Sequence, residues 1–203
     1  MIYFRPFWWT WLSLKFNPEI HYRRSLRLKG YNYANCGAYF VTMCAQNREC
    51  LFGDIVAGVM QINKYGLMIQ KWWMELPNKF KNVEMNTYMI MPNHLHGIIS
   101  IVGADRCVCP DRKYADSNKG AHTGAPLHRI VQWFKTMSTN EYLRNIYEKG
   151  WQRLNGKLWQ RNYYDHIIRN ETELDRIRQY IINNPSQWDN DENNPAHYRK
   201  DDF

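Results

Sequence analysis

Hydrophobic and polar positions follow two different periods along the chain, and these periods predict its secondary structure. Residues 38–45 (AYFVTMCA) and 83–90 are apolar and rich in β-branched or aromatic side chains, which is typical of strands. The tight turn 91–93 (MPN) leads into a third predicted strand over residues 94–101. Between the first two strands, apolar side chains recur at helical spacing from Tyr65 to Leu76, and Pro77 should end that helix.

The second half of the chain continues with two helices and a strand. Apolar positions between Leu127 and Phe134 lie on one face of a predicted helix, and residues 159–168 are predicted as a fourth strand. The last predicted helix begins at the N-cap residue Asn170, with Glu173 in capping-box position. Its apolar positions are Leu174, Ile177 and Ile181, and Pro185 should end it at Asn184.

This order of elements predicts an α+β fold. Strand, helix, strand, strand, helix, strand is the βαββαβ order of a ferredoxin-like (RRM-like) antiparallel sheet with helices on one face, and the last helix is an addition. We expect an N-terminal arm over residues 1–22, one domain over 23–190 and a polar tail over 191–203. The Gly-, Asp-, Lys- and Ser-rich stretch 103–125 has no periodicity and is expected to be a mobile loop.

Charge and cysteine content narrow the class of protein. There are 27 Lys and Arg against 19 Asp and Glu, a formal charge of +8, which suits a polyanionic partner such as nucleic acid; charge alone fits a soluble protein with a basic surface equally well. The five cysteines have no regular spacing, so we expect a reducing, cytoplasmic setting without a disulfide framework. The apolar stretch 1–16 is too short to span a bilayer and lacks a cleavage site.

Two short patterns carry candidate chemistry. His94 and His96 alternate along a predicted strand, so both imidazoles face the same way and could bind one divalent metal ion, although a pair of this kind also occurs by chance. Tyr180 and Asn184 are four residues apart, so the phenol and the amide share one face of the last helix. Spacing alone favours a packing tyrosine and an ordinary helix-terminal asparagine.

Several longer strings in a fixed order are far more specific. They are RRSLRLKGYNY (23–33), GAYFVTMCAQNRECLFG (37–53), MPNHLHGII (91–99), LWQRNYYDHIIRN (158–170) and YIINNP (180–185). With these strings the chain resembles the REP-associated tyrosine transposases, relatives of the single-tyrosine HUH (His-hydrophobic-His) insertion-sequence transposases. The resemblance runs from about residue 23 to residue 188.

The resemblance implies a role for each of the four residues. His94 and His96 would be the HUH pair, Tyr180 the nucleophile and Asn184 a third ligand of Mg²⁺ or Mn²⁺. The implied activity is cleavage and rejoining of single-stranded DNA near a hairpin through a 5′-phosphotyrosyl intermediate. Because two neutral imidazoles and an amide add no negative charge, we expect weak metal binding without DNA.

Substrate binding needs cations and flat surfaces. The resemblance makes the basic run 23–29 a candidate for recognising DNA at the hairpin foot, and exposed aromatic side chains of 159–164 could stack on unpaired bases. The candidate DNA-binding residues are Arg23, Arg24, Arg27, Lys29, Lys135, Arg161 and Arg169.

Other interpretations stay open at this point. His166 is a further candidate ligand or proton-transfer group, and Tyr163 and Tyr164 are rival nucleophiles. The chain could instead be a catalytically silent single-stranded nucleic-acid-binding module, or an HUH nickase for replication or plasmid transfer. The apolar positions of the last predicted helix are compatible with a monomer and with a homodimer that exchanges helices.

Overall fold

A computed structural model describes residues 32–33, 35–102 and 125–197 of the 203-residue chain. The predicted N-terminal arm, the basic residues Arg23, Arg24, Arg27 and Lys29, and nearly all of the predicted loop 103–125 lie outside the described residues. The described strands are β1 (Gly37–Cys44), β2 (Gly53–Val56), β3 (Val59–Ile62), β4 (Val83–Ile90), β5 (His94–Ile101) and β6 (Tyr164–Ile168). The described α-helices are α1 (Lys64–Met74), α2 (Leu76–Lys79), α3 (Leu127–Lys149) and α4 (Glu171–Asn183).

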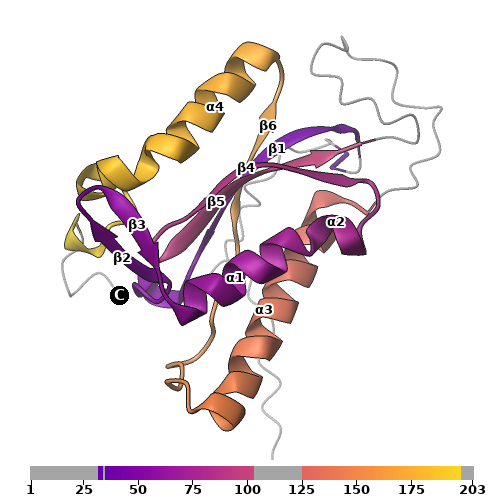
Figure 1. The fold of residues 1–203 in the computed structure, drawn as a ribbon. Coiled ribbons are helices and arrows are strands. Elements are labelled where there is room, and N and C mark those ends of the chain that lie inside the picture. The colour runs from indigo at the N-terminus through magenta and orange to yellow at the C-terminus, as the bar shows by residue number, and fades with distance from the viewer. Residues whose placement is uncertain (1–31, 34, 103–124, 198–203) are drawn as a thin grey trace, which may run out of the picture.

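Four of the strands form one antiparallel sheet in the order β4-β5-β1-β6. With the helices between them, this is the βαββαβ arrangement of a ferredoxin-like sheet, so the predicted fold class is confirmed. Helices α1 and α3 cover one face, and α4 crosses the other face (Figure 1). Both central strands, β1 and β5, are therefore buried on both sides.

The alternation of side chains along β1 and β5 divides the interior into two cores. Tyr39, Val41, Met43, Leu95 and Ile99 belong to the large core with α1 and α3. The smaller core lies under α4 and consists of Ala38, Phe40, Ile98, Ile168, Leu174, Ile177 and Ile181. His94 and His96 alternate with Leu95 and share the side of the sheet of Ile98, so they face α4, whereas Leu95 points into the large core.

One glycine in β5 permits the close packing of α1. A Cβ atom at Gly97 would lie 2.3 Å from the ring of Trp73, which is itself completely buried. A larger residue at this position would push α1 away from the sheet.

The structure corrects two of the predicted boundaries and adds a hairpin. The helix predicted to end at Pro77 stops at Met74, and Pro77 lies in the first turn of α2. The fourth strand begins at Tyr164 rather than at residue 159: Trp159 forms only an isolated bridge with Ala45, and the carbonyls of Gln160 and Asn162 then accept hydrogen bonds from the Lys135 ammonium. The β2–β3 hairpin was not predicted, and it turns at Ala57 and Gly58, both with positive φ.

Helix α4 begins and ends where the sequence predicts. The Asn170 side chain accepts a hydrogen bond from Glu173 N, and the helix ends at Asn183 before Pro185. Two 3-10 helices follow, η2 (Asn184–Asn190) and η3 (Pro195–His197). Within the described ranges, no helix has both the length and the apolar character needed to cross a membrane.

Candidate active site

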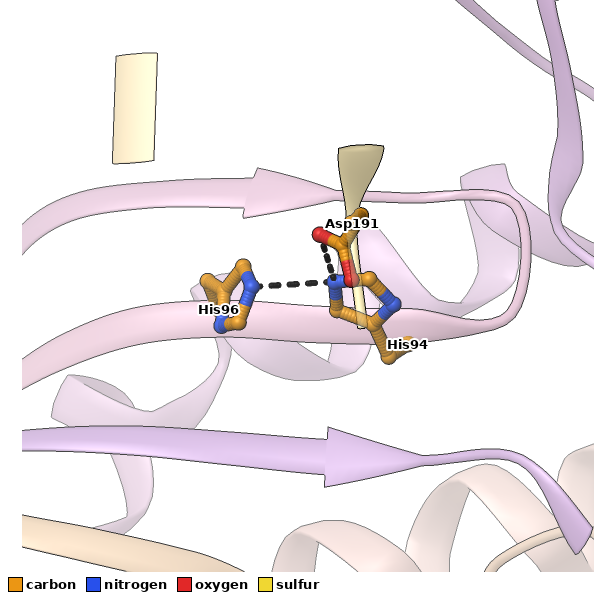
Figure 2. A group of neighbouring side chains, drawn as sticks. All are labelled: His94, His96 and Asp191. Atoms are coloured by element: carbon orange, nitrogen blue, oxygen red, sulfur yellow. Dashed lines mark hydrogen bonds and ion pairs between the residues drawn. The ribbon is translucent and has the colours of Figure 1, made fainter. Parts of the chain in front are cut away.

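The two histidines predicted as a metal-binding pair converge beneath α4. His94 and His96 are fully buried, and their Nε2 atoms are 2.9 Å apart (Figure 2). Alternate positions on a strand are roughly 7 Å apart, so the two rings lean towards one another. This brings two imidazole nitrogens within reach of a single ion.

Asn93 orients the ring of His94. Its Nδ2 donates hydrogen bonds to the carbonyls of Arg48 (2.9 Å) and Asn193 (2.7 Å), so its Oδ1 is the atom that faces His94 Nδ1 at 2.8 Å. An amide oxygen accepts and does not donate, so His94 carries its proton on Nδ1. The lone pair of Nε2 is then directed at His96, as a metal ligand requires.

His96 has a comparable partner on the neighbouring strand. Thr42 Oγ1 lies 2.8 Å from His96 Nδ1, because Thr42 is opposite His96 in the β1–β5 register. The ring also stacks on Phe40, with centroids 5.4 Å apart. The ring of His96 is thus oriented from the neighbouring strand, whereas the ring of His94 is oriented by Asn93 in the turn before β5.

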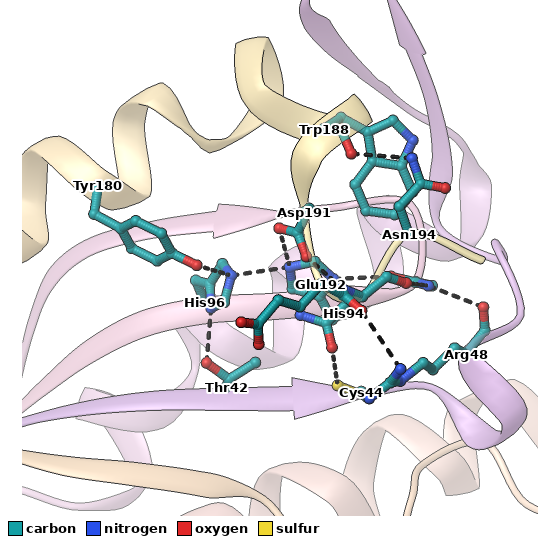
Figure 3. A network of polar contacts seen from close by, with 12 residues as sticks. Thr42, Cys44, Arg48, His94, His96, Tyr180, Trp188, Asp191, Glu192 and Asn194 are labelled. Atoms are coloured by element: carbon teal, nitrogen blue, oxygen red, sulfur yellow. Dashed lines mark hydrogen bonds and ion pairs between the residues drawn. The ribbon is translucent and has the colours of Figure 1, made fainter. Parts of the chain in front are cut away.

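Asp191 completes a group of three possible metal ligands with the histidine pair. The ligand atoms of His94, His96 and Asp191 all lie within 4.8 Å of one another, and all three residues are buried. Asp191 Oδ1 accepts a hydrogen bond from Asn193 N, and Oδ2 lies 3.8 Å from His94 Nε2 (Figure 3). No described residue donates a hydrogen bond to Oδ2.

Both histidines are neutral at physiological pH. Burial, and secondarily the nearby Arg48, lower the pKa of His94 from 6.5 to about 3. Burial and His94 also lower the pKa of His96 well below 6.5, although Asp191 opposes the shift. The contact between His94 and Asp191 is therefore not an ion pair at neutral pH, and the carboxylate is buried beside two neutral rings.

Tyr180 brings a phenol to the same group of residues. It lies on α4 and is 44% exposed, and its Oη is 3.4 Å from His96 Nε2. Its ring meets Phe40 edge-on. Burial, followed by the charges of Asp191 and Glu192, raises the pKa of Tyr180 above 10, so the phenol is protonated at neutral pH.

Asn184 lies at the end of α4, one turn after Tyr180. It is buried, and no hydrogen-bond partner for its Oδ1 is found among the described residues. The unpartnered buried oxygen of Asp191 beside two neutral imidazoles fits a divalent cation, which binds such nitrogen and oxygen donors. The Asn184 side chain hydrogen-bonds with Tyr180, and this bond opposes the rise in the pKa of the phenol.

The predicted DNA-binding residues that the structure describes lie away from the histidine pair. Arg169 precedes α4, at the end of the helix opposite to Tyr180. Lys135 and Arg161 line a groove of about 660 Å³ along α3, together with Tyr163, and the histidine pair does not line it. The Lys135 ammonium donates to two backbone carbonyls there, and burial lowers its pKa to about 8.

The structure also places the other candidate ligand, His166, and the rival nucleophiles, Tyr163 and Tyr164. His166 Nε2 lies 2.8 Å from Glu173 Oε1 at the start of α4, so this histidine interacts with the helix cap. Tyr164 pairs with Thr42 across β1 and β6 and shares the face of the histidine pair, whereas Tyr163 packs against the large core.

The sequence analysis missed Asp191, Asn93 and Thr42 as site residues. Asp191 lies in the segment predicted as a polar tail, where a single acidic residue among several carries no pattern. Asn93 directly precedes the histidine pair, so its position was a usable signal. Thr42 could be found only from the pairing of β1 with β5.

Comparison with known proteins places the chain in a family. Residues 120–184 match the model of the family described as "Transposase IS200 like". An uncharacterised protein of Haemophilus influenzae is 40% identical over 186 residues, which cover 89% of this chain and 98% of that protein. The chain belongs to the IS200-like transposase family, and the sequence-based assignment to the insertion-sequence transposases is confirmed.

Two solved structures are also similar. A REP-associated tyrosine transposase bound to a REP hairpin is 17% identical, with a TM-score of 0.49 over 80% of this chain and 73% of that one. A protein assigned as a transposase from Deinococcus radiodurans R1 is 14% identical, with a TM-score of 0.43 over 77% of this chain and 95% of that one.

Proposed function

We propose that this chain is a REP-associated tyrosine transposase that cuts and rejoins single-stranded DNA beside a hairpin, with Tyr180 as nucleophile. The observation that carries the proposal is the 3.4 Å approach of Tyr180 Oη to His96 Nε2. Helix α4 and strand β5 of one chain make this contact, which supports a site assembled within one protomer.

The reaction needs the phenol oxygen to replace a DNA oxygen on phosphorus. Tyr180 Oη bonds to the scissile phosphorus, the bond from phosphorus to the 3′ oxygen breaks, and the phenolic proton is balanced by protonation of that 3′ oxygen. The product is a 5′-phosphotyrosyl link and a free 3′-hydroxyl. A 3′-hydroxyl of a second strand can reverse the same exchange, so joining needs no external energy source.

The phenol at this position requires assistance. Tyr180 is a weak nucleophile because burial and the neighbouring carboxylates keep it protonated. A divalent cation held by His94 and His96 would polarise the scissile phosphate and offset the negative charge near the phenol. We propose Mg²⁺ or Mn²⁺ for this role, with Asn184 as a further oxygen ligand because its Oδ1 is buried without a partner.

The proposed substrate is single-stranded DNA with a hairpin. The net charge of +8 and the basic segment RRSLRLKGYNY at 23–33 support this substrate, as does the hairpin bound to a related transposase. Arg23, Arg24, Arg27 and Lys29 remain the proposed hairpin contacts, with Lys135, Arg161 and Arg169 as further backbone contacts.

The test is formation of a covalent protein–DNA adduct. Labelled single-stranded hairpin DNA from the flanks of the gene is incubated with Mn²⁺ and wild-type protein, Tyr180→Phe or Tyr164→Phe, and resolved on a denaturing gel. We expect an adduct in wild type and Tyr164→Phe, and none in Tyr180→Phe or with chelator. Tyr164→Phe is the matched control because it removes a phenol from the same face of the sheet.

Two results would contradict the proposal. An adduct that persists in Tyr180→Phe and disappears in Tyr164→Phe would move the nucleophile to β6. Tight hairpin binding without any adduct would indicate a silent binding module.

A further inference from the structure

Asp191 belongs to a segment that folds back over the histidine pair. Strand β5 holds His94 and His96, α4 holds Tyr180, and Asp191 directly follows η2 (Figure 3). Trp188 lies over the His94 ring with centroids 6.1 Å apart, and Asn93 Nδ2 donates to the carbonyl of Asn193. The segment around Asp191 is thus attached to the site at several points.

Only one of the two oxygens of the Asp191 carboxylate has a hydrogen-bond partner among the described residues. Its side chain is only 4% exposed, and Oδ1 accepts a 2.6 Å hydrogen bond from Asn193 N. Oδ2 is buried, has no hydrogen-bond partner among the described residues and faces His94 Nε2 at 3.8 Å. Burial of an uncompensated carboxylate is unfavourable, and binding of a cation is a common way to offset its cost.

We propose that Asp191 is a metal ligand and that its charge lets the site bind a divalent cation before DNA arrives. The inference rests on the proposed metal-dependent function. It replaces the expectation, drawn from the sequence, that the site binds metal only weakly without DNA. Two neutral imidazoles and a carboxylate supply one negative charge, whereas the histidine pair with Asn184 supplies none. DNA phosphate is then not required to complete the donor set.

The experiment measures Mn²⁺ binding to the DNA-free full-length protein by titration with electron paramagnetic resonance detection of free Mn²⁺. We expect Asp191→Asn to weaken binding by about 10-fold or more, since even outer partners of metal ligands have effects of this size. Glu192→Gln is the matched control: it removes the same charge from the adjacent exposed residue and should leave affinity nearly unchanged. Equal affinity of wild type and Asp191→Asn, or no binding by wild type, would overturn the inference.

A second variant distinguishes direct coordination from a general electrostatic effect and does not depend on the stability of Asp191→Asn. Asp191→Cys is titrated with Co²⁺, and a thiolate-to-cobalt absorption band is expected because a coordinated thiol is deprotonated. Wild type and Glu192→Cys should lack the band, although Cys44 lies nearby in both proteins. Absence of the band in a folded Asp191→Cys protein that binds Co²⁺ would overturn the inference.

Tyr180→Phe separates this inference from the proposed function. The variant should bind Mn²⁺ like wild type, because it keeps all the proposed ligands. If metal binding depends on Asp191 but wild-type protein forms no adduct, only the transposase chemistry is contradicted. If wild-type protein forms the adduct but metal binding does not depend on Asp191, only the role of Asp191 is contradicted.

Discussion

His94 and His96 are buried beneath α4 as neutral rings, and this burial has a cost that changes with pH. In the folded protein the pKa of His94 is about 3, compared with an ordinary value of 6.5, and the pKa of His96 is lowered in the same direction. The unfolded chain therefore takes up protons as the pH falls through 6.5, while the folded chain does not until about pH 3. The stabilisation is complete above pH 6.5 and is lost progressively below it.

We predict that the free energy of unfolding of the metal-free protein falls between pH 7 and pH 5. Each histidine contributes a slope of up to about 1.4 kcal/mol per pH unit at the lower end of this range. Urea denaturation in chelator at several pH values measures the slope. His94→Gln should be less pH-dependent than wild type, because it lacks one titrating group, and an unchanged slope in this variant would contradict the assignment.

At the level of elements, α4, which carries the proposed nucleophile Tyr180, begins at a cap formed by its own residues. Asn170 Oδ1 accepts from Glu173 N, and Glu173 Oε2 accepts from Arg169 N, so the cap satisfies two backbone donors. The hydrogen bond from Arg169 N and the contact with His166 also lower the pKa of Glu173. The cap and the apolar positions of α4 were both evident in the sequence because they depend on local spacing.

The cap yields a prediction for stability. Asn170→Ala should lower the free energy of unfolding by about 1 kcal/mol, because Glu173 N loses its acceptor at the first turn of α4. Asn170→Asp retains an acceptor oxygen and should stay close to wild type. Chemical denaturation of the three proteins at pH 7 measures the difference, and equal loss in both variants would show that the side-chain acceptor is not the cause.

The whole molecule carries a charge of +8, and this charge should dominate its encounter with DNA. Among the described cations, Arg48 lies near His94, whereas Arg161 lines the groove along α3 and Arg169 lies at the far end of α4 from Tyr180. A bound strand would therefore have to contact the molecule over a wide area to use Arg161 and Arg169 as well as the proposed nucleophile Tyr180.

We predict a steep salt dependence for the binding of single-stranded hairpin DNA. With about four phosphate contacts, affinity should fall about 50-fold between about 50 and 200 mM salt. Fluorescence anisotropy over a salt series measures the slope. Arg161→Ala should reduce the slope by about 0.7, whereas Arg153→Ala, an exposed arginine outside the groove, should not. Similar slopes in all three proteins would exclude Arg161 as a contact.

The periods of the sequence were enough to identify β1, β4, β5, α3 and α4 and the order that defines the fold. Local patterns also indicated His94, His96, Tyr180 and Asn184, because residues two apart on a strand or four apart on a helix share a face. The short β2–β3 hairpin and the start of β6 were not predicted. Four-residue strands have too little alternation to stand out, and β6 starts where the contacts of Lys135 end.

Contacts between distant segments were beyond any local pattern. Asp191 is 97 residues after His94 along the chain (191 minus 94), and its place beside the histidines depends on how η2 folds back after α4. Thr42 acquires its role from the pairing of β1 with β5, and Asn93 from a hydrogen bond to Asn193 in the segment that follows η2. Periodicity determines which face of a helix or strand is buried. Long-range packing determines which polar groups come into contact on that face, and the electrostatics of this site depend on those contacts.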